Sequence, residues 1–173
     1  MTRKSFIGII VLIIYREYLI KMFQENLFKE EKNYIMSIKE GSANAIFNNL
    51  KPHEFRRRFD SYQGKARIFL YVTKPTAKIM GEIICETPII GSIDKMIELL
   101  SENKYDTENT LRNYLSNSKE SFALPIISTC RYENSIPLSE MRNLFPNFFP
   151  PMSSQRLDSE KYKNILEFLL NRK

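Results

Sequence analysis

A run of three arginines, Arg56, Arg57 and Arg58, is the feature of the sequence that most suggests chemistry. Alternate side chains of an extended strand point the same way, so Glu54, Arg56 and Arg58 would share one face. Two guanidinium groups on one face can hold adjacent phosphates through paired hydrogen bonds. A solvated basic strand edge explains such a run equally well, so the arginines alone leave both interpretations open.

The wider charge distribution places the excess of positive charge around this run. The 173-residue chain carries 26 Lys and Arg against 20 Asp and Glu, a formal net charge of +6. Residues 35–86 hold nine basic and five acidic side chains, whereas residues 87–173 hold eleven of each. A localised basic region favours a polyanionic partner such as a nucleic acid.

The scarcity of histidine and cysteine weakens or excludes several classes of site. His53 is the only histidine, and Cys85 and Cys130 are the only cysteines, each in an apolar run. A catalytic histidine pair cannot be built, and a disulfide framework or a structural zinc site is disfavoured. The chain also lacks the GxGxxG and P-loop signatures of nucleotide binding. We therefore expect no metal, no cofactor and a cytoplasmic location with reduced cysteines.

The elements that must position these residues alternate between strands and short helices. Strands are predicted at 34–39, 53–59, 66–73, 77–90 and 122–130, and helices at 42–49, 93–101, 107–116, 137–144 and 158–171. Ser42, Thr107 and Asp158 are the expected N-caps, and Pro125 suits an edge strand or a bulge. This pattern predicts the α+β class, with a small mixed or antiparallel β-barrel surrounded by short helices.

The first 33 residues have a different character from the rest. Residues 6–15 are the most apolar stretch of the chain, and Arg16 interrupts it. As a helix, ten residues would span about 15 Å, roughly half the apolar core of a bilayer. We predict a mainly helical N-terminal extension over residues 1–33. Membrane contact through residues 5–22 is a disfavoured alternative, and a translation start at Met22 or Met36 is a third.

Several segments, taken in order, resemble one known family. The opening segments are Tyr34–Lys39, Ala43–Phe47 and Glu54–Arg58, and the later ones are Leu70–Pro75, Lys78–Glu82, Phe122–Ile126 and Asn147–Leu157. They resemble, in turn, the first strand, first helix, basic strand, paired central strands, late strand and closing Pro-Pro-Gln-Ser motif of an ASCH domain. The resemblance implies a PUA-like barrel over residues 34–158, followed by a C-terminal helix over 159–173.

The same resemblance implies a nucleic-acid-binding cleft between the barrel and its first helix, with RNA as the favoured ligand. The candidate binding residues are Lys39, Lys51, Arg56, Arg58, Lys74, Gln155 and Arg156. Tyr71 or Phe55 could stack on a base, although we favour core positions for both. Such a module could act as a regulator in transcription or translation.

An amidohydrolase acting on a modified nucleoside, such as N4-acetylcytidine, is the alternative function. Some ASCH proteins carry out this reaction with a Lys-Thr-Glu arrangement. By resemblance Lys51 falls near the lysine, Glu54 takes the threonine position and Glu82 is a candidate carboxylate. Because the nucleophile position holds no threonine, we favour binding over catalysis, and we assign catalytic roles to these three residues only under this alternative.

Overall fold

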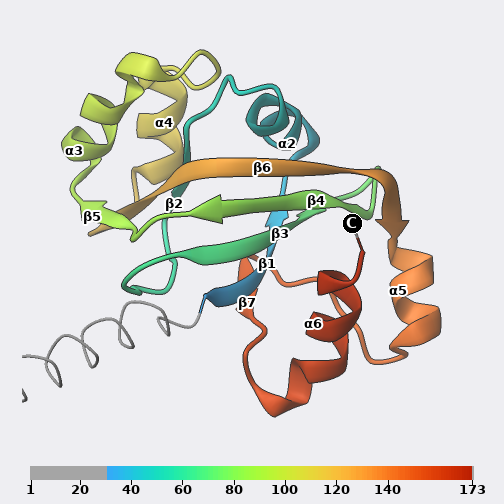
Figure 1. The fold of residues 1–173 in the computed structure, drawn as a ribbon. Coiled ribbons are helices and arrows are strands. Elements are labelled where there is room, and N and C mark those ends of the chain that lie inside the picture. The colour runs from blue at the N-terminus through green and yellow to red at the C-terminus, as the bar shows by residue number, and fades with distance from the viewer. Residues whose placement is uncertain (1–30, 173) are drawn as a thin grey trace, which may run out of the picture. The chain divides into compact units, whose positions relative to one another are not determined.

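The computed structural model describes residues 31–172, which from Glu31 onward form one compact unit. Its strands are β1 (Lys32–Ile38), β2 (His53–Arg56), β3 (Ala66–Val72), β4 (Lys78–Cys85), β5 (Ile89–Gly91), β6 (Ser121–Pro137) and β7 (Ser154–Arg156). They form a curled sheet in the order β2-β6-β4-β3-β1-β7, with β5 also paired to β6 (Figure 1). Among these strands β1 and β3 run parallel and the other pairs antiparallel, as a mixed sheet requires.

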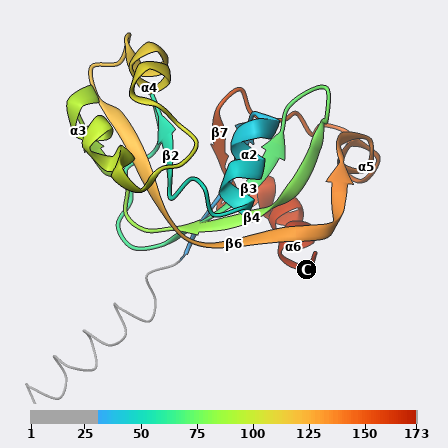
Figure 2. The ribbon, with the colours of Figure 1, turned by 90° about the horizontal axis from the view of Figure 1, so that it is seen from above.

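Five α-helices accompany the sheet within the described part of the chain. They are α2 (Glu40–Phe47), α3 (Ile93–Glu98), α4 (Glu108–Leu115), α5 (Leu138–Leu144) and α6 (Lys163–Leu170), with short 3₁₀ turns at Leu99–Glu102 and Glu160–Tyr162. Figure 2 separates them into α3 and α4 at one end, α2 over the sheet, and α5 and α6 toward the other end. The α+β class predicted from the sequence is confirmed, and the predicted mixed barrel is present as a curled half-barrel.

The central strand β3 explains why helices cover both faces of the sheet. Its sequence alternates so that Ile68 and Leu70 pack on one side with Ala43 and Ile46 of α2. Phe69 and Tyr71 pack on the other side with residues of α5 and α6. All seven side chains except Arg67 are buried, which is typical of a strand enclosed on two faces.

Strand β6 links the main sheet to a second group of elements. Its first residues pair with β2 and β5, and Phe122 faces both Arg56 and Ile90. From Ile126 onward it pairs with β4 instead, through a bulge. Pro125 lies at this change of partner, so the bulge expected from the sequence is present and the edge position is not.

Helices α3 and α4 lie between β5 and β6 and have their own core. Met96, Leu111 and Leu115 pack against Phe55 of β2 and Ala123 of β6. This cluster holds α4 beside β2, and therefore beside the basic segment that the sequence pointed to.

The helix caps agree with the sequence in one case and differ in two. Thr107 accepts the backbone N–H of Thr110, whose side chain returns the bond in a capping box. Ser42 is not the cap of α2, because the helix begins at Glu40 and Lys39 takes the cap position. Asp158 is not a helix cap either: its carboxylate accepts from the backbone of Asn33 and from Arg156.

The ends of the predicted domain are joined to each other through β1. This strand begins at Lys32 and pairs with β7, while Leu169 of α6 shares a core with Ile35. The predicted extension over residues 1–33 and its membrane contact through residues 5–22 fall almost wholly outside the described residues. Within residues 31–172, none of the helices has the length and apolarity needed to cross a bilayer.

Candidate nucleic-acid interface

A cavity of about 390 Å³ lies where the end of β1, α2, β2 and α4 meet. Its volume is in the range of sites that take small molecules. The residues that line it are Ser37, Ile38, Lys39, Ser42, Lys51, Glu54, Phe55, Arg56, Thr73, Asp106, Thr110, Leu111, Tyr114 and Met152. Hydrogen-bond donors, acceptors and apolar surface are thus all present in one open cavity.

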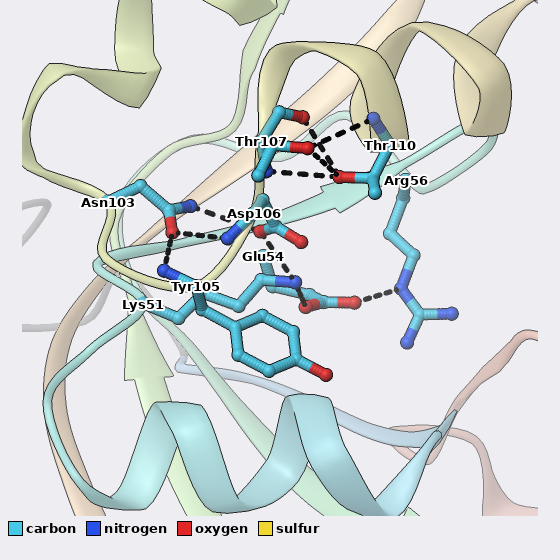
Figure 3. A network of polar contacts seen from close by, with 8 residues as sticks. All are labelled: Lys51, Glu54, Arg56, Asn103, Tyr105, Asp106, Thr107 and Thr110. Atoms are coloured by element: carbon cyan, nitrogen blue, oxygen red, sulfur yellow. Dashed lines mark hydrogen bonds and ion pairs between the residues drawn. The ribbon is translucent and has the colours of Figure 1, made fainter.

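A buried ion-pair network forms one wall of the cavity (Figure 3). The Lys51 Nζ lies 2.9 Å from Glu54 Oε2 and 3.0 Å from Asp106 Oδ2, and only 5% of the lysine side chain is exposed. Burial by itself lowers the pKa of Lys51, but the carboxylates of Glu54 and Asp106 outweigh it, so the pKa is raised above its ordinary value. Lys51 is therefore a permanent cation at neutral pH.

Arg56 completes the network from the other side of Glu54. Its Nε lies 3.0 Å from Glu54 Oε1, and its Nη2 donates to the carbonyl of Ser37 at 2.7 Å. The side chain is nearly as buried as Lys51. The Glu54 carboxylate is consequently held between two cations, and much of the Arg56 guanidinium is already occupied.

The loop before α4 is built to present Asp106. The Asn103 side-chain oxygen accepts the backbone N–H groups of Tyr105 and Asp106, and its amide donates to the Asp106 carboxylate. The capping box at Thr107 then starts the helix immediately afterwards. Because these bonds already hold the Asp106 carboxylate in place, less conformational entropy is lost when it pairs with Lys51.

Tyr105 closes the gap between this loop and α2. Lys51 Nζ lies 5.6 Å from the centre of its ring, a cation–π contact. A Cβ atom added at Gly41 would lie 2.6 Å from the Tyr105 hydroxyl, so a side chain there would displace the ring. Gly41 therefore permits α2 to approach the network closely.

The structure brings together only some of the residues predicted from the sequence. Lys39, Lys51, Glu54 and Arg56 line the cavity. The predicted binding residues Arg58, Lys74, Gln155 and Arg156 are not among the lining residues. Strand β2 ends at Arg56, so the strand alternation that would align Arg58 with Arg56 does not extend that far.

The remaining predicted residues have other surroundings. Arg58 and Lys74 are exposed, the latter in the turn after β3. Gln155 donates to the carbonyl of Arg156, and the Arg156 guanidinium is paired with Asp158 at 2.8 Å.

Glu82 does not converge with Lys51 and Glu54. It is buried on β4, where it pairs with Arg67 and accepts a hydrogen bond of 3.0 Å from the Tyr132 hydroxyl. Arg67 is bound in turn to Glu31. The three residues assigned to an amidohydrolase are thus split between the cavity and a separate buried cluster, and Lys51 is charged rather than free to take up a proton.

Sequence reasoning missed the contribution of the α3–α4 region. Asp106, Thr110 and Tyr114 come from a part of the chain with no net charge, so charge gave no signal there. The preference for core positions at Phe55 and Tyr71 is confirmed, since both are buried. Phe55 nevertheless also lines the cavity, and Tyr114, 41% exposed, is a second aromatic lining residue that the sequence did not point to.

The described residues hold no group of three or more His, Cys, Asp or Glu side chains placed to bind a metal ion. The polar side chains that line the cavity carry hydroxyl groups, two carboxylates and three cationic groups.

Comparison with known proteins gives the fold a name. No family model matches the chain. A curated protein of Zymomonas mobilis named "ASCH domain-containing ribonuclease" is 24% identical over 137 residues, which cover 79% of this chain and 92% of the relative. The crystal structure of ASCH from the same organism superposes with a TM-score of 0.68, at 24% identity, over 79% of this chain and 94% of that one.

This is an ASCH fold. The resemblance first seen in the ordered sequence segments is thereby confirmed, and ASCH structures are PUA-like. The N-terminal domain of Staphylothermus marinus McrB has a weaker likeness, with a TM-score of 0.50 at 11% identity over 78% of this chain and 93% of that domain. The cavity lies beside α2, the helix that the resemblance implied for a cleft, but α4 and the loop before it also contribute to its lining.

Proposed function

We propose that the protein binds single-stranded RNA, with one unstacked base in the cavity and the phosphates on exposed cations around it. The observation that carries this proposal is the buried Lys51–Glu54–Arg56 network in the wall of an open cavity of about 390 Å³. The relative's name, which includes the word ribonuclease, supports RNA as the ligand class.

The charges within the cavity favour a base over a phosphate. Glu54 and Asp106 already compensate Lys51 and Arg56, so little uncompensated positive charge remains in the interior. The network instead offers fixed donors and acceptors, which suit the polar edge of a nucleobase. An edge of this kind becomes available when the base leaves its stack, and a single strand provides that at the lowest cost.

The exposed cations suit the phosphates. Lys39 lines the cavity and is exposed. Three further cations, Arg57, Arg58 and Lys74, are also exposed and lie close in sequence to residues that line the cavity. Each phosphate neutralised on a single strand releases counterions, with a slope of about 0.7 per contact in a plot of log affinity against log salt.

Anisotropy with a fluorescent 12-nucleotide RNA tests the proposal, using the same sequence as a duplex and as DNA for comparison. We expect binding to the single strand that weakens with salt, and a Lys39→Ala variant that binds less tightly with a salt slope smaller by about 0.7. Lys163→Ala removes a comparably exposed lysine on α6 and serves as the control. Equal binding of duplex and single strand, or a flat salt dependence, would reject the proposal.

RNA cleavage is a second candidate, favoured by a carboxylate placed between two cations. Glu54 could accept the proton of a ribose 2′-hydroxyl while that oxygen attacks the adjacent phosphorus. The bond from phosphorus to O5′ then breaks, O5′ takes a proton from solvent, and a 2′,3′-cyclic phosphate remains. Lys51 and Arg56 would stabilise the negative charge that develops on the phosphate oxygens.

Gel analysis of end-labelled RNA tests this step. Wild type should release a cyclic-phosphate end, Glu54→Gln should bind the RNA without cutting it, and a substrate with a single 2′-deoxy position should resist cleavage there. Cleavage that persists in Glu54→Gln purified in parallel would assign the activity to another residue or to a contaminant.

A regulatory role would depend on which RNAs are bound. Sequencing of RNA recovered with the tagged protein from its host tests this directly. Enrichment of a small set of transcripts that is lost in Lys39→Ala would support regulation, whereas recovery in proportion to abundance would oppose it.

A further inference from the structure

Two exposed aromatic rings, each beside an arginine, lie in segments that border the cavity. Phe149, in the loop between α5 and β7, is 75% exposed, and the Arg142 guanidinium lies 5.8 Å from the centre of its ring. Tyr114, on α4, is 41% exposed, with Arg57 at 5.2 Å. Neither ring contributes to a core cluster within residues 31–172.

The loop that carries Phe149 is held firmly in place. Phe148 next to it is buried in the core with α5 and α6, and the two phenylalanines together line a second, smaller pocket with Pro151. The Ser37 hydroxyl donates to the carbonyl of Pro151, and its backbone N–H donates to the carbonyl of Ser153. Between these bonds Met152 is fully exposed and also lines the cavity.

Apolar side chains that a rigid loop holds in solvent beside a polar cavity indicate a role in ligand recognition rather than in folding. Phe149 and Met152 gain nothing from burial in the folded chain, while prolines and the Ser37 bonds restrict the loop. A preordered surface loses less entropy when a ligand covers it.

The arginines beside these rings remain available for a ligand. Arg172, which lies over Phe168, is bound to Glu140, and Lys51, over Tyr105, has two carboxylate partners. Arg57 and Arg142 are exposed and form no ion pair within residues 31–172. An aromatic face next to an unpaired guanidinium matches a nucleotide, which has a base to stack and a phosphate to bind.

We infer that a single RNA strand crosses the mouth of the cavity, with one base stacked on Tyr114 and another on Phe149. This inference rests on the proposed function, since it takes the base between them to be the one inside the cavity. Tyr114 and Met152 both line the cavity, and Phe149 is three residues from Met152, so it lies at most about 11 Å away along the chain. Arg57 and Arg142 bind the flanking phosphates.

The inference assigns the ligand class as an unstructured RNA of several nucleotides, rather than a free nucleoside. Roughly four nucleotides, the lower end of the site sizes known for single-strand-binding folds, would be needed to engage both rings. Each ring should then add to the affinity for a longer strand, and the Phe149 ring, which lies outside the cavity lining, should leave the affinity for a very short one unchanged.

Titrations with RNAs of two and eight nucleotides test this. Phe149→Leu and Tyr114→Leu should each weaken binding of the eight-nucleotide RNA by about fivefold or more, since stacking of a base on an aromatic side chain contributes about 1–3 kcal/mol. Phe149→Leu, which changes a residue outside the cavity lining, should bind the dinucleotide as wild type does. Arg142→Ala should reduce the salt slope for the longer RNA by about 0.7.

Controls separate this result from a failure of the proposed function. Leu144→Ala removes an exposed apolar side chain of α5 that is 52% exposed, and should change neither affinity. Absence of wild-type binding to either RNA would reject both proposals. Wild-type binding with equal affinity for both lengths, or normal binding of the longer RNA by Phe149→Leu, would reject the two-ring path alone and leave the loop as a surface for a protein partner.

Discussion

Replacement of Lys51 by methionine should destabilise the protein strongly, although the new side chain is apolar and of similar length. Lys51 is 5% exposed and neutralises both Glu54 and Asp106. Its loss leaves the Asp106 carboxylate without its cation and the Glu54 carboxylate with Arg56 alone, in the wall of the cavity. Removal of one partner from a buried ion pair costs about 3–5 kcal/mol, which is a large part of the about 5–15 kcal/mol stability of a typical domain.

The expected change is large enough to measure by two methods. At about 2–4 °C per kcal/mol for a chain of this size, the melting temperature should fall by roughly 6–20 °C. The chain contains no tryptophan, so circular dichroism in a urea titration is a better probe than fluorescence. The pKa of Lys51 is raised, so its stabilising effect is fully present below about pH 10 and is lost only as the pH rises through the raised value. The difference in stability between wild type and Lys51→Met should therefore stay constant between pH 7 and 9.

Arg112 supplies a matched control. It also binds two carboxylates, Glu108 at 2.8 Å and Asp94 at 3.0 Å, but it lies on the surface with 46% of its side chain exposed. Arg112→Met should have little measurable effect, because water screens such pairs. Restoring part of the stability by adding Asp106→Asn to Lys51→Met would identify the unpaired carboxylate as the cause. The reasoning is refuted if Lys51→Met melts like wild type, or if Arg112→Met is equally harmful.

Three other changes have expected outcomes. Gly81→Ala should lower the urea midpoint by an amount equivalent to at least about 2 kcal/mol, because a Cβ would lie 2.2 Å from the carbonyl oxygen of Cys130; unchanged stability would contradict this contact. A thiol reagent should label one cysteine rapidly in the native protein and a second after unfolding, since Cys130 is exposed and burial raises the pKa of Cys85. Burial lowers the pKa of His53 despite the opposing effect of Glu102, so protonation of His53 costs stability as the pH falls below about 6.5. Urea titrations between pH 6.5 and 5 should therefore show a smaller loss of stability for His53→Gln than for wild type. An equal loss of stability in the two proteins would refute this.

The parts of the fold that depend on local pattern were predictable from the sequence. The aromatic and β-branched residues of 66–73 identified a strand, and Thr107 identified the start of α4. Pro125 identified an irregularity, although not its setting inside a 17-residue strand, since pairing partners depend on segments far away in the chain.

The candidate site was only half predictable for the same reason. Lys51 and Glu54 are three residues apart, so their pairing is a local event. Asp106 reaches the same lysine from beyond four strands, β2 to β5, and helix α3, and nothing in its own neighbourhood marks it as a partner. Arg58 was misplaced because the strand pattern continued further in the sequence than the hydrogen bonds continue in the sheet.

The pairing of Gly91 with Ser121 brings the two ends of the α3–α4 segment side by side. Residues 92–120 therefore form one continuous insertion between β5 and β6, and both of its ends lie at the same point of the sheet. We call this insertion the cassette. This cassette supplies Asp106, Thr110, Leu111 and Tyr114 to the cavity, whereas the sheet, α2 and the loops beside them supply the rest. Evolution or a protein engineer can therefore exchange one wall of the site, and with it the choice of ligand, by replacing a single continuous segment while the pairing of the main sheet stays as it is.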